Sequence, residues 1–172
     1  MNKADFQNQL FTGRTHVFAI LDGASIDGLL TKLYEMQPPN YCLFRGELSP
    51  DVAETAPYLV GLVAGSQFSE WLFKGHFGKH WGIFALSRQS ITEMRKHFRA
   101  LVKVHDEEGK AMIFRFYDPR VLSQYLPTCE PDELKAFFGK VDAFFSESPD
   151  GKKMSRFTIE NGTLGQFELG EK

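Results

Sequence analysis

The segment His16-Val17-Phe18-Ala19-Ile20-Leu21-Asp22 is an almost unbroken apolar run, and it constrains the fold more than any other part of the chain. A strand with one solvent-exposed face alternates apolar and polar residues, so an unbroken apolar run predicts a strand that is covered on both faces. Sheets of that kind have helices packed on each side. Further apolar runs predict strands at residues 41–44, 58–63, 81–86 and 141–145.

Helical segments are expected between several of these runs. Ser25 is placed to cap a helix over residues 26–36. The order strand, helix, strand predicts that residues 16–22 and 41–44 pair in parallel across a helical crossover. The tetrapeptide Ser90-Ile91-Thr92-Glu93 is a capping box, which predicts the start of another helix.

The whole pattern predicts a single α/β domain, with a mixed β-sheet flanked by helices, over residues 16–160. Residues 1–15 are expected to form an N-terminal arm or a short helix, and residues 161–172 a polar C-terminal tail. The last strand is expected at residues 154–159, antiparallel to its predecessor, with an edge that could accept a strand from a partner. A chain of 172 residues is long enough to bury a substantial core as one domain.

Composition disfavours several classes of protein. The formal net charge is −2 and the pI is near 6.2, which does not suggest a nucleic-acid-binding protein. Cys42 and Cys129 are far apart and form no CxxC motif, which is typical of a reduced, cytoplasmic protein rather than a disulfide scaffold. No apolar run has the length of a membrane span, and no signal peptide is evident. The 17 phenylalanines indicate a thick core or an aromatic surface for a partner.

Residues 112–120, Met-Ile-Phe-Arg-Phe-Tyr-Asp-Pro-Arg, bring charged groups together at the end of a strand. Alternating apolar residues predict a strand in the first part of this run, with Arg115 on the opposite face. Asp118 and Pro119 are typical of a helix N-cap and first turn. Arg115, Asp118 and Arg120 therefore form either an ion-pair clamp between strand and helix or a site for an anionic ligand. The clamp is favoured because no nucleophile or set of metal ligands accompanies it.

Other candidate sites have simpler structural explanations. His76 and His80 are four residues apart, as in a metal-binding helix, but the glycines around them disfavour a helix and no third ligand is nearby. Asp22 and Asp27 could be paired acids, although turn and helix-start carboxylates are more common. The basic residues of 95–103 either bind an acidic partner or form the solvated side of an amphipathic helix. With no nucleophile motif or phosphate-binding loop, the residues alone give no reason to expect an enzyme.

Five segments, taken in order, resemble one protein family. They are Ala19-Ile20-Leu21-Asp22-Gly23-Ala24, Ala56-Pro57-Tyr58-Leu59-Val60, His80-Trp81-Gly82-Ile83-Phe84, His97-Phe98-Arg99 and the run from Phe114 to Leu122. Together they resemble the adaptor/chaperone domain of bacterial type VI secretion, long catalogued only as a domain of unknown function. The resemblance covers about residues 16–145, and the family pattern fades beyond them, where partner specificity is expected to reside.

The resemblance implies a cytoplasmic, non-catalytic protein that binds a toxic effector, through the N-terminal region of the effector, and helps to load it onto the VgrG spike protein before export. It implies no cofactor, metal, nucleic acid or membrane. The positions that match the family signature are expected either to hold the fold or to contact the partner. They are Pro57, Tyr58, Trp81, Gly82, Arg99, Arg115, Tyr117, Asp118, Pro119 and Arg120.

An alternative function stays open at this point. It is a small-molecule-binding or enzymatic α/β domain, in which Arg115, Asp118 and Arg120 hold an anionic ligand. Such a domain needs a deep pocket beside these groups. The adaptor instead needs an exposed surface of the order of 1,000 Å² or more.

Overall fold

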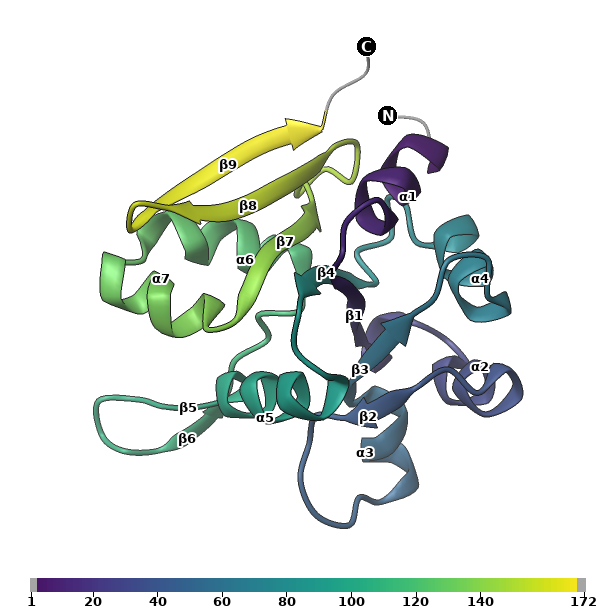
Figure 1. Cartoon of the computed structure of the whole chain (residues 1–172). Helices are drawn as coiled ribbons and strands as arrows, with labels where there is room; N and C mark the ends of the chain where they lie inside the picture. Colours follow the sequence, from purple (N-terminus) through teal and green to yellow (C-terminus); the bar gives the residue numbers. More distant parts are fainter. Residues whose placement is uncertain (1–2, 170–172) are drawn as a thin grey trace.

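A seven-stranded antiparallel sheet forms the centre of the structure (Figure 1). The structure is a computed structural model and describes residues 3–169. The strands lie in the order β2-β3-β1-β4-β7-β8-β9. Their bounds are β1 His16–Asp22, β2 Asn40–Cys42, β3 Pro57–Leu62, β4 Gly82–Ser87, β7 Val141–Glu147, β8 Met154–Glu160 and β9 Thr163–Leu169. A separate hairpin pairs β5 Lys103–His105 with β6 Ala111–Ile113.

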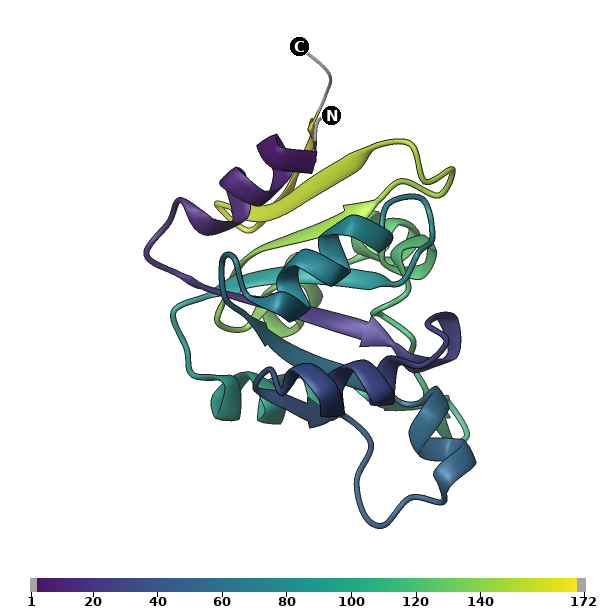
Figure 2. The ribbon, with the colours of Figure 1, turned by 90° about the vertical axis from the view of Figure 1, so that its right-hand side faces the viewer.

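Helices cover both faces of the large sheet (Figures 1 and 2). One face carries α1 Lys3–Phe11, α2 Leu29–Met36 and α4 Gln67–Gly75. The other carries α5 Ile91–Val102, α6 Pro119–Tyr125 and α7 Pro131–Phe138. The remaining elements are α3 Pro50–Thr55 and the 3-10 turns η1 Gly23–Ser25 and η2 Leu126–Thr128. The expected α/β domain, a sheet flanked by helices, is confirmed. No helix within residues 3–169 is both long and apolar enough to cross a membrane.

The core has two layers because successive residues of the central strands point to opposite faces. In β1, Val17, Ala19 and Leu21 belong to the layer under α1, α2 and α4. Phe18 and Ile20 belong to the layer under α5, α6 and α7. All five side chains are buried, which explains why this segment has no polar alternation.

Phe6 of α1 lies at the centre of the first layer. Its ring is 5.3 Å from Phe84 of β4 and 5.9 Å from Phe145 of β7, measured between ring centroids. Both contacts are edge-to-face, an arrangement that aromatic rings prefer. The N-terminal helix is therefore part of the core and not a detached arm.

The expected parallel pairing of residues 16–22 and 41–44 is wrong. Strand β3 lies between β1 and β2 and is antiparallel to both. The first and second strands thus run in the same direction without bonding to each other, and the connection through α2 crosses over one strand. A later segment of the chain, β3, takes the position beside β1 and pairs with it over six residues, and β2 pairs with the other side of β3 over three.

Three local expectations also differ from the structure. Ser25 does not cap α2, which starts after Gly28, because its hydroxyl donates to Asp22 Oδ2 at 2.8 Å. The strand expected through Phe116 ends at Ile113, and Phe116 is buried under α5. The segment expected as a polar tail contains β9, which pairs along the whole of β8, so the 154–159 strand is not an edge.

Candidate functional site

Asp22, at the end of β1, is the centre of a charged cluster that we call the clamp: Asp22, Arg115, Asp118 and Arg120. Arg115 Nη2 donates to Asp22 Oδ2 at 2.6 Å, and the same nitrogen lies 3.9 Å from Asp118 Oδ2. Asp22 also accepts from Ser25 Oγ and from the backbone N–H of Ala24. The clamp thus ties the segment before α6 to β1, an inner strand of the sheet.

Asp118 and Arg120 form the second half of the clamp. Arg120 donates through Nε to Asp118 Oδ1 at 3.0 Å and through Nη2 to Oδ2 at 2.7 Å, a two-pronged pair. Asp118 Oδ1 also accepts the backbone N–H of Arg120 at 2.9 Å, so Asp118 caps α6 as predicted, with Pro119 in the first turn. The two arginines and the two aspartates are matched in charge within the cluster.

The pKa values of the clamp fit a static role. Burial by itself would raise the pKa of Asp118, but hydrogen bonds from Arg120 hold it below its ordinary value. Burial would lower the pKa of Arg115, but its bond to Asp22 keeps that pKa above the ordinary value. Burial and then the charge of Asp22 raise the pKa of Tyr117 to about 12. Asp118, Arg115 and Tyr117 therefore each keep one protonation state at neutral pH, unlike a general acid or base.

Three further signature residues lie beside Asp22, at the starts of β3 and β4. Pro57, the first residue of β3, is the register partner of Asp22 in the neighbouring strand β1. The backbone N–H of Asp22 donates to the carbonyl oxygen of Trp81 at 2.9 Å. A Cβ atom at Gly82 would overlap the carbonyl oxygen of Ile20, so only glycine allows β4 to approach β1 this closely. Segments far apart in the sequence therefore converge on one strand end.

The aromatic signature residues have packing roles near the same place. The Tyr58 hydroxyl donates to the carbonyl oxygen of Ala53 at 2.8 Å and so ties β3 to α3. Tyr117 is buried beside α5 and α6. The Trp81 ring stacks on Trp71 of α4, with centroids 5.5 Å apart.

Arg99 is a signature residue on α5 that forms no bond to the clamp. It projects from α5 and donates through Nε and Nη2 to the carbonyl oxygen of Cys42, at 3.2 and 2.8 Å. A longer bond of 3.4 Å reaches the carbonyl oxygen of Phe44. Its guanidinium fixes the chain as it leaves β2, one of the two edge strands of the sheet.

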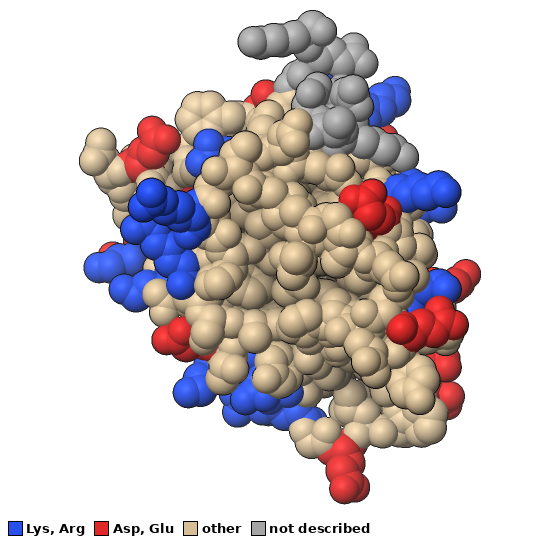
Figure 3. All heavy atoms as spheres, turned by 45° about the vertical axis from the view of Figure 1, so that its right-hand side comes forward, with Lys and Arg blue, Asp and Glu red and all other residues tan. Residues whose placement is uncertain are grey.

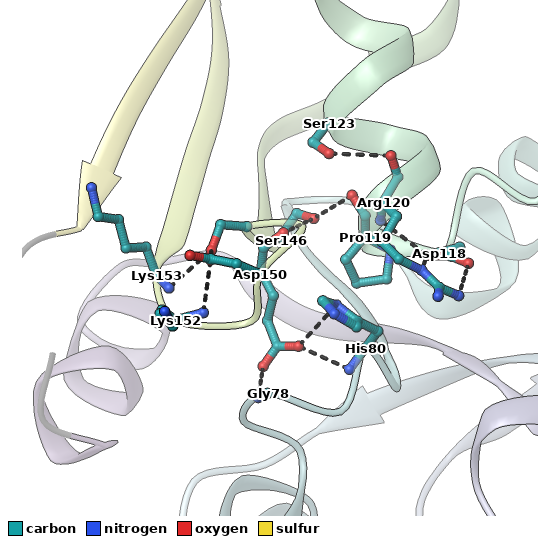
Figure 4. A network of polar contacts seen from close by, with 12 residues as sticks. Gly78, His80, Asp118, Pro119, Arg120, Ser123, Ser146, Asp150, Lys152 and Lys153 are labelled. Atoms are coloured by element: carbon teal, nitrogen blue, oxygen red, sulfur yellow. Dashed lines mark hydrogen bonds and ion pairs between the residues drawn. The ribbon is translucent and has the colours of Figure 1, made fainter.

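A buried acid that the sequence patterns did not reveal holds the loop after α4. Glu147, at the end of β7, accepts the backbone N–H of Gly78 at 2.6 Å and of His80 at 2.9 Å (Figure 4). The His80 ring Nδ1 is 3.5 Å from the same carboxylate. Burial raises the pKa of Glu147 in spite of these bonds. The sequence does show a carboxylate at the end of an apolar strand, but the loop residues that Glu147 holds are far from it in the sequence, so no local pattern connects them.

The arrangement of the predicted site residues favours the clamp over a ligand site. The charged groups of Arg115 and Arg120 already bond to the two aspartates, so an anion would have to displace a buried carboxylate. Asp27, considered as a partner for Asp22, is exposed and forms no part of the cluster. Within the described residues, no group of three or more His, Cys, Asp or Glu side chains is placed to hold a metal ion.

A family model described as "Domain of unknown function (DUF4123)" matches residues 17–136. The matched region runs from β1 into α7 and contains the clamp and all the signature positions. Strands β7, β8 and β9 lie beyond it. No curated protein and no solved structure matches the chain.

Proposed function

Because this chain belongs to the DUF4123 family, which is associated with type VI secretion effectors, we propose that it is an adaptor that binds such an effector. In this proposal it acts in the cytoplasm and helps to load the effector onto the VgrG spike protein before export. The observation that carries the proposal is the family match, since it covers most of the chain, from residue 17 to residue 136.

The geometry of the clamp supports a non-catalytic role. Asp22 and Asp118 accept hydrogen bonds from Arg115, Arg120 and nearby backbone groups, so the signature charges are used inside the protein. An enzyme site instead needs a group that is free to meet a substrate. We therefore propose that the signature residues hold the frame and that binding uses the surface, with no cofactor.

The surface has the character that a protein partner needs. Figure 3 shows a broad face with few charged side chains at its centre and with Lys, Arg, Asp and Glu along its margins. Protein interfaces commonly have a weakly charged centre and a polar rim. Large apolar side chains are also exposed, among them Tyr34, Val63, Ile113 and Phe167.

Co-expression tests the proposal directly. The full chain is produced with a tagged copy of the effector encoded beside it, and the complex is purified and its stoichiometry measured by light scattering. A stable complex is expected, together with loss of effector delivery when the adaptor gene is deleted. An effector from an unrelated cluster is the control. If the neighbouring effector never co-purifies and its delivery is unchanged by the deletion, the proposal is wrong.

A further inference from the structure

A groove on the α5 side of the molecule is separate from the clamp. It has a volume of about 580 Å³ and lies between the end of α5, the segment after β2 and the β5–β6 hairpin. Its lining is mainly apolar with a positively charged part: Leu43, Phe44, Arg45, Leu48, Arg99, Ala100, Val102, Lys103 and Ile113. None of these lining residues is acidic.

The walls of the groove are held in place by hydrogen bonds. Arg99 fixes the segment after β2 through its 2.8 Å bond to the carbonyl oxygen of Cys42. The backbone N–H of Phe114 donates to the carbonyl oxygen of Val102 at 2.8 Å and fixes the base of the hairpin to the end of α5. A groove with fixed walls loses little conformational entropy when it is filled.

Apolar side chains and cations are both exposed at the groove. Ile113 is 54% exposed and Met112 beside it is 45% exposed, in a hairpin whose strands are otherwise open to solvent. Arg45 and Lys103 are exposed, and within residues 3–169 neither has an ion-pair partner. Apolar side chains beside unpaired cations complement a segment that carries carboxylates next to aliphatic residues.

The hairpin favours a polypeptide over a small anion. β5 and β6 form a two-stranded sheet, so each strand has an edge with no neighbouring strand among residues 3–169. Backbone groups on such an edge can pair with an extended segment, while the groove receives its side chains. A small anion would use only the cations and would leave Ile113 exposed.

We infer that this groove binds a short acidic and aliphatic segment of the effector, with Ile113 as the apolar contact and Lys103 and Arg45 as the charged ones. The inference rests on the proposed function and adds where the effector docks and which chemistry it presents. Arg99 acts here as a positioning residue, because its guanidinium bonds to backbone carbonyls of the groove wall.

The test measures the Kd of the full chain for the neighbouring effector by calorimetry, with two groove variants and two matched comparators. Ile113→Asp is compared with Phe167→Asp, since Phe167 on the edge strand β9 is 48% exposed, close to the 54% of Ile113. Lys103→Glu is compared with Lys96→Glu, which reverses an exposed charge of α5 outside the groove. Melting temperatures check that each variant is folded.

The groove variants are expected to raise Kd about tenfold or more, and the comparators by about twofold or less. Reversing a carboxylate in the effector segment that the complex protects from hydrogen exchange should restore binding to Lys103→Glu. If wild type binds and the groove variants bind equally well, the inference is wrong and the proposed function stands. Weakening by Phe167→Asp alone would move docking to the sheet edge. If wild type does not bind at all, both the inference and the proposed function fail.

Discussion

The ion pair between Asp22 and Arg115 joins a buried group to a half-exposed one, and this asymmetry can be measured. Asp22 is 1% exposed and Arg115 is 47% exposed at the side chain. Replacing Arg115 by Met keeps an apolar stem, and among residues 3–169 the buried carboxylate then keeps its hydrogen bonds from Ser25 Oγ and the Ala24 N–H. Asp22→Asn removes the charge instead. The double variant removes the pair altogether, so a double-mutant cycle isolates its coupling energy.

The expected coupling lies between two reference cases. Hydrogen bonds to charged groups contribute about 1.5–3 kcal/mol, whereas exposed ion pairs contribute about 0.2–1 kcal/mol. Because only one partner is buried and the N–O distance is 2.6 Å, we expect a coupling of about 1.5–2.5 kcal/mol. We expect Arg115→Met alone to lower the free energy of unfolding by roughly 2–3 kcal/mol, since it leaves a buried charge uncompensated.

Urea unfolding followed by circular dichroism, with the slope m compared between variants, gives the four free energies. The control cycle uses Lys32→Met and Glu35→Gln, a pair at 2.9 Å whose side chains are 35% and 51% exposed. Its coupling should be about 0.5 kcal/mol or less. A coupling at the clamp no larger than that of the control pair would refute the argument that the clamp holds the fold.

Asp118→Ala should lower the free energy of unfolding by about 1–3 kcal/mol, because it removes a helix cap and takes the carboxylate partner from the Arg120 guanidinium. The pKa of Asp118 is held below its ordinary value of 3.8. Its carboxylate should therefore stabilise the fold above that pH, and this stabilisation should be lost as the pH falls through the pKa of the folded protein. Urea titrations at a series of pH values should show that the stability of Asp118→Asn depends less on acid than that of the wild type. Gly82→Ala should prevent folding, judged by circular dichroism, whereas Gly61→Ala, whose Cβ would meet no atom closer than 3.5 Å, should fold with a loss of about 1 kcal/mol or less. Glu147→Ala should speed hydrogen exchange at the Gly78 amide while the exchange of β1 amides stays unchanged; equal rates at Gly78 would contradict the proposed loop contact.

Features with a local cause were predictable from the sequence. The capping box at Ser90 and Glu93 does start α5 at Ile91, with both reciprocal hydrogen bonds formed. The Asp118-Pro119 pair does start α6. In both cases, the groups that interact are within three residues of each other, so the pattern and the contact coincide.

Features that depend on distant segments were not predictable in the same way. Asp22 and Arg115 are 93 positions apart, and no single-sequence pattern connects them. The insertion of β3 between β1 and β2 is of the same kind, because strand order is decided by competition among segments across the whole chain. Ser25 shows the effect locally: a residue suited to cap a helix bonds to Asp22 instead.

The place of Phe6 in the core has a consequence for synthesis of the protein. The helix that carries it is synthesised long before two of the rings that enclose it, those of Phe84 and Phe145. In the same way, β4 keeps an open edge until β7 has been translated, and open edges invite association with other chains. The growing polypeptide must therefore carry an uncovered Phe6 ring and an unfinished sheet until β7 has been synthesised. Only when β7 emerges can both be buried.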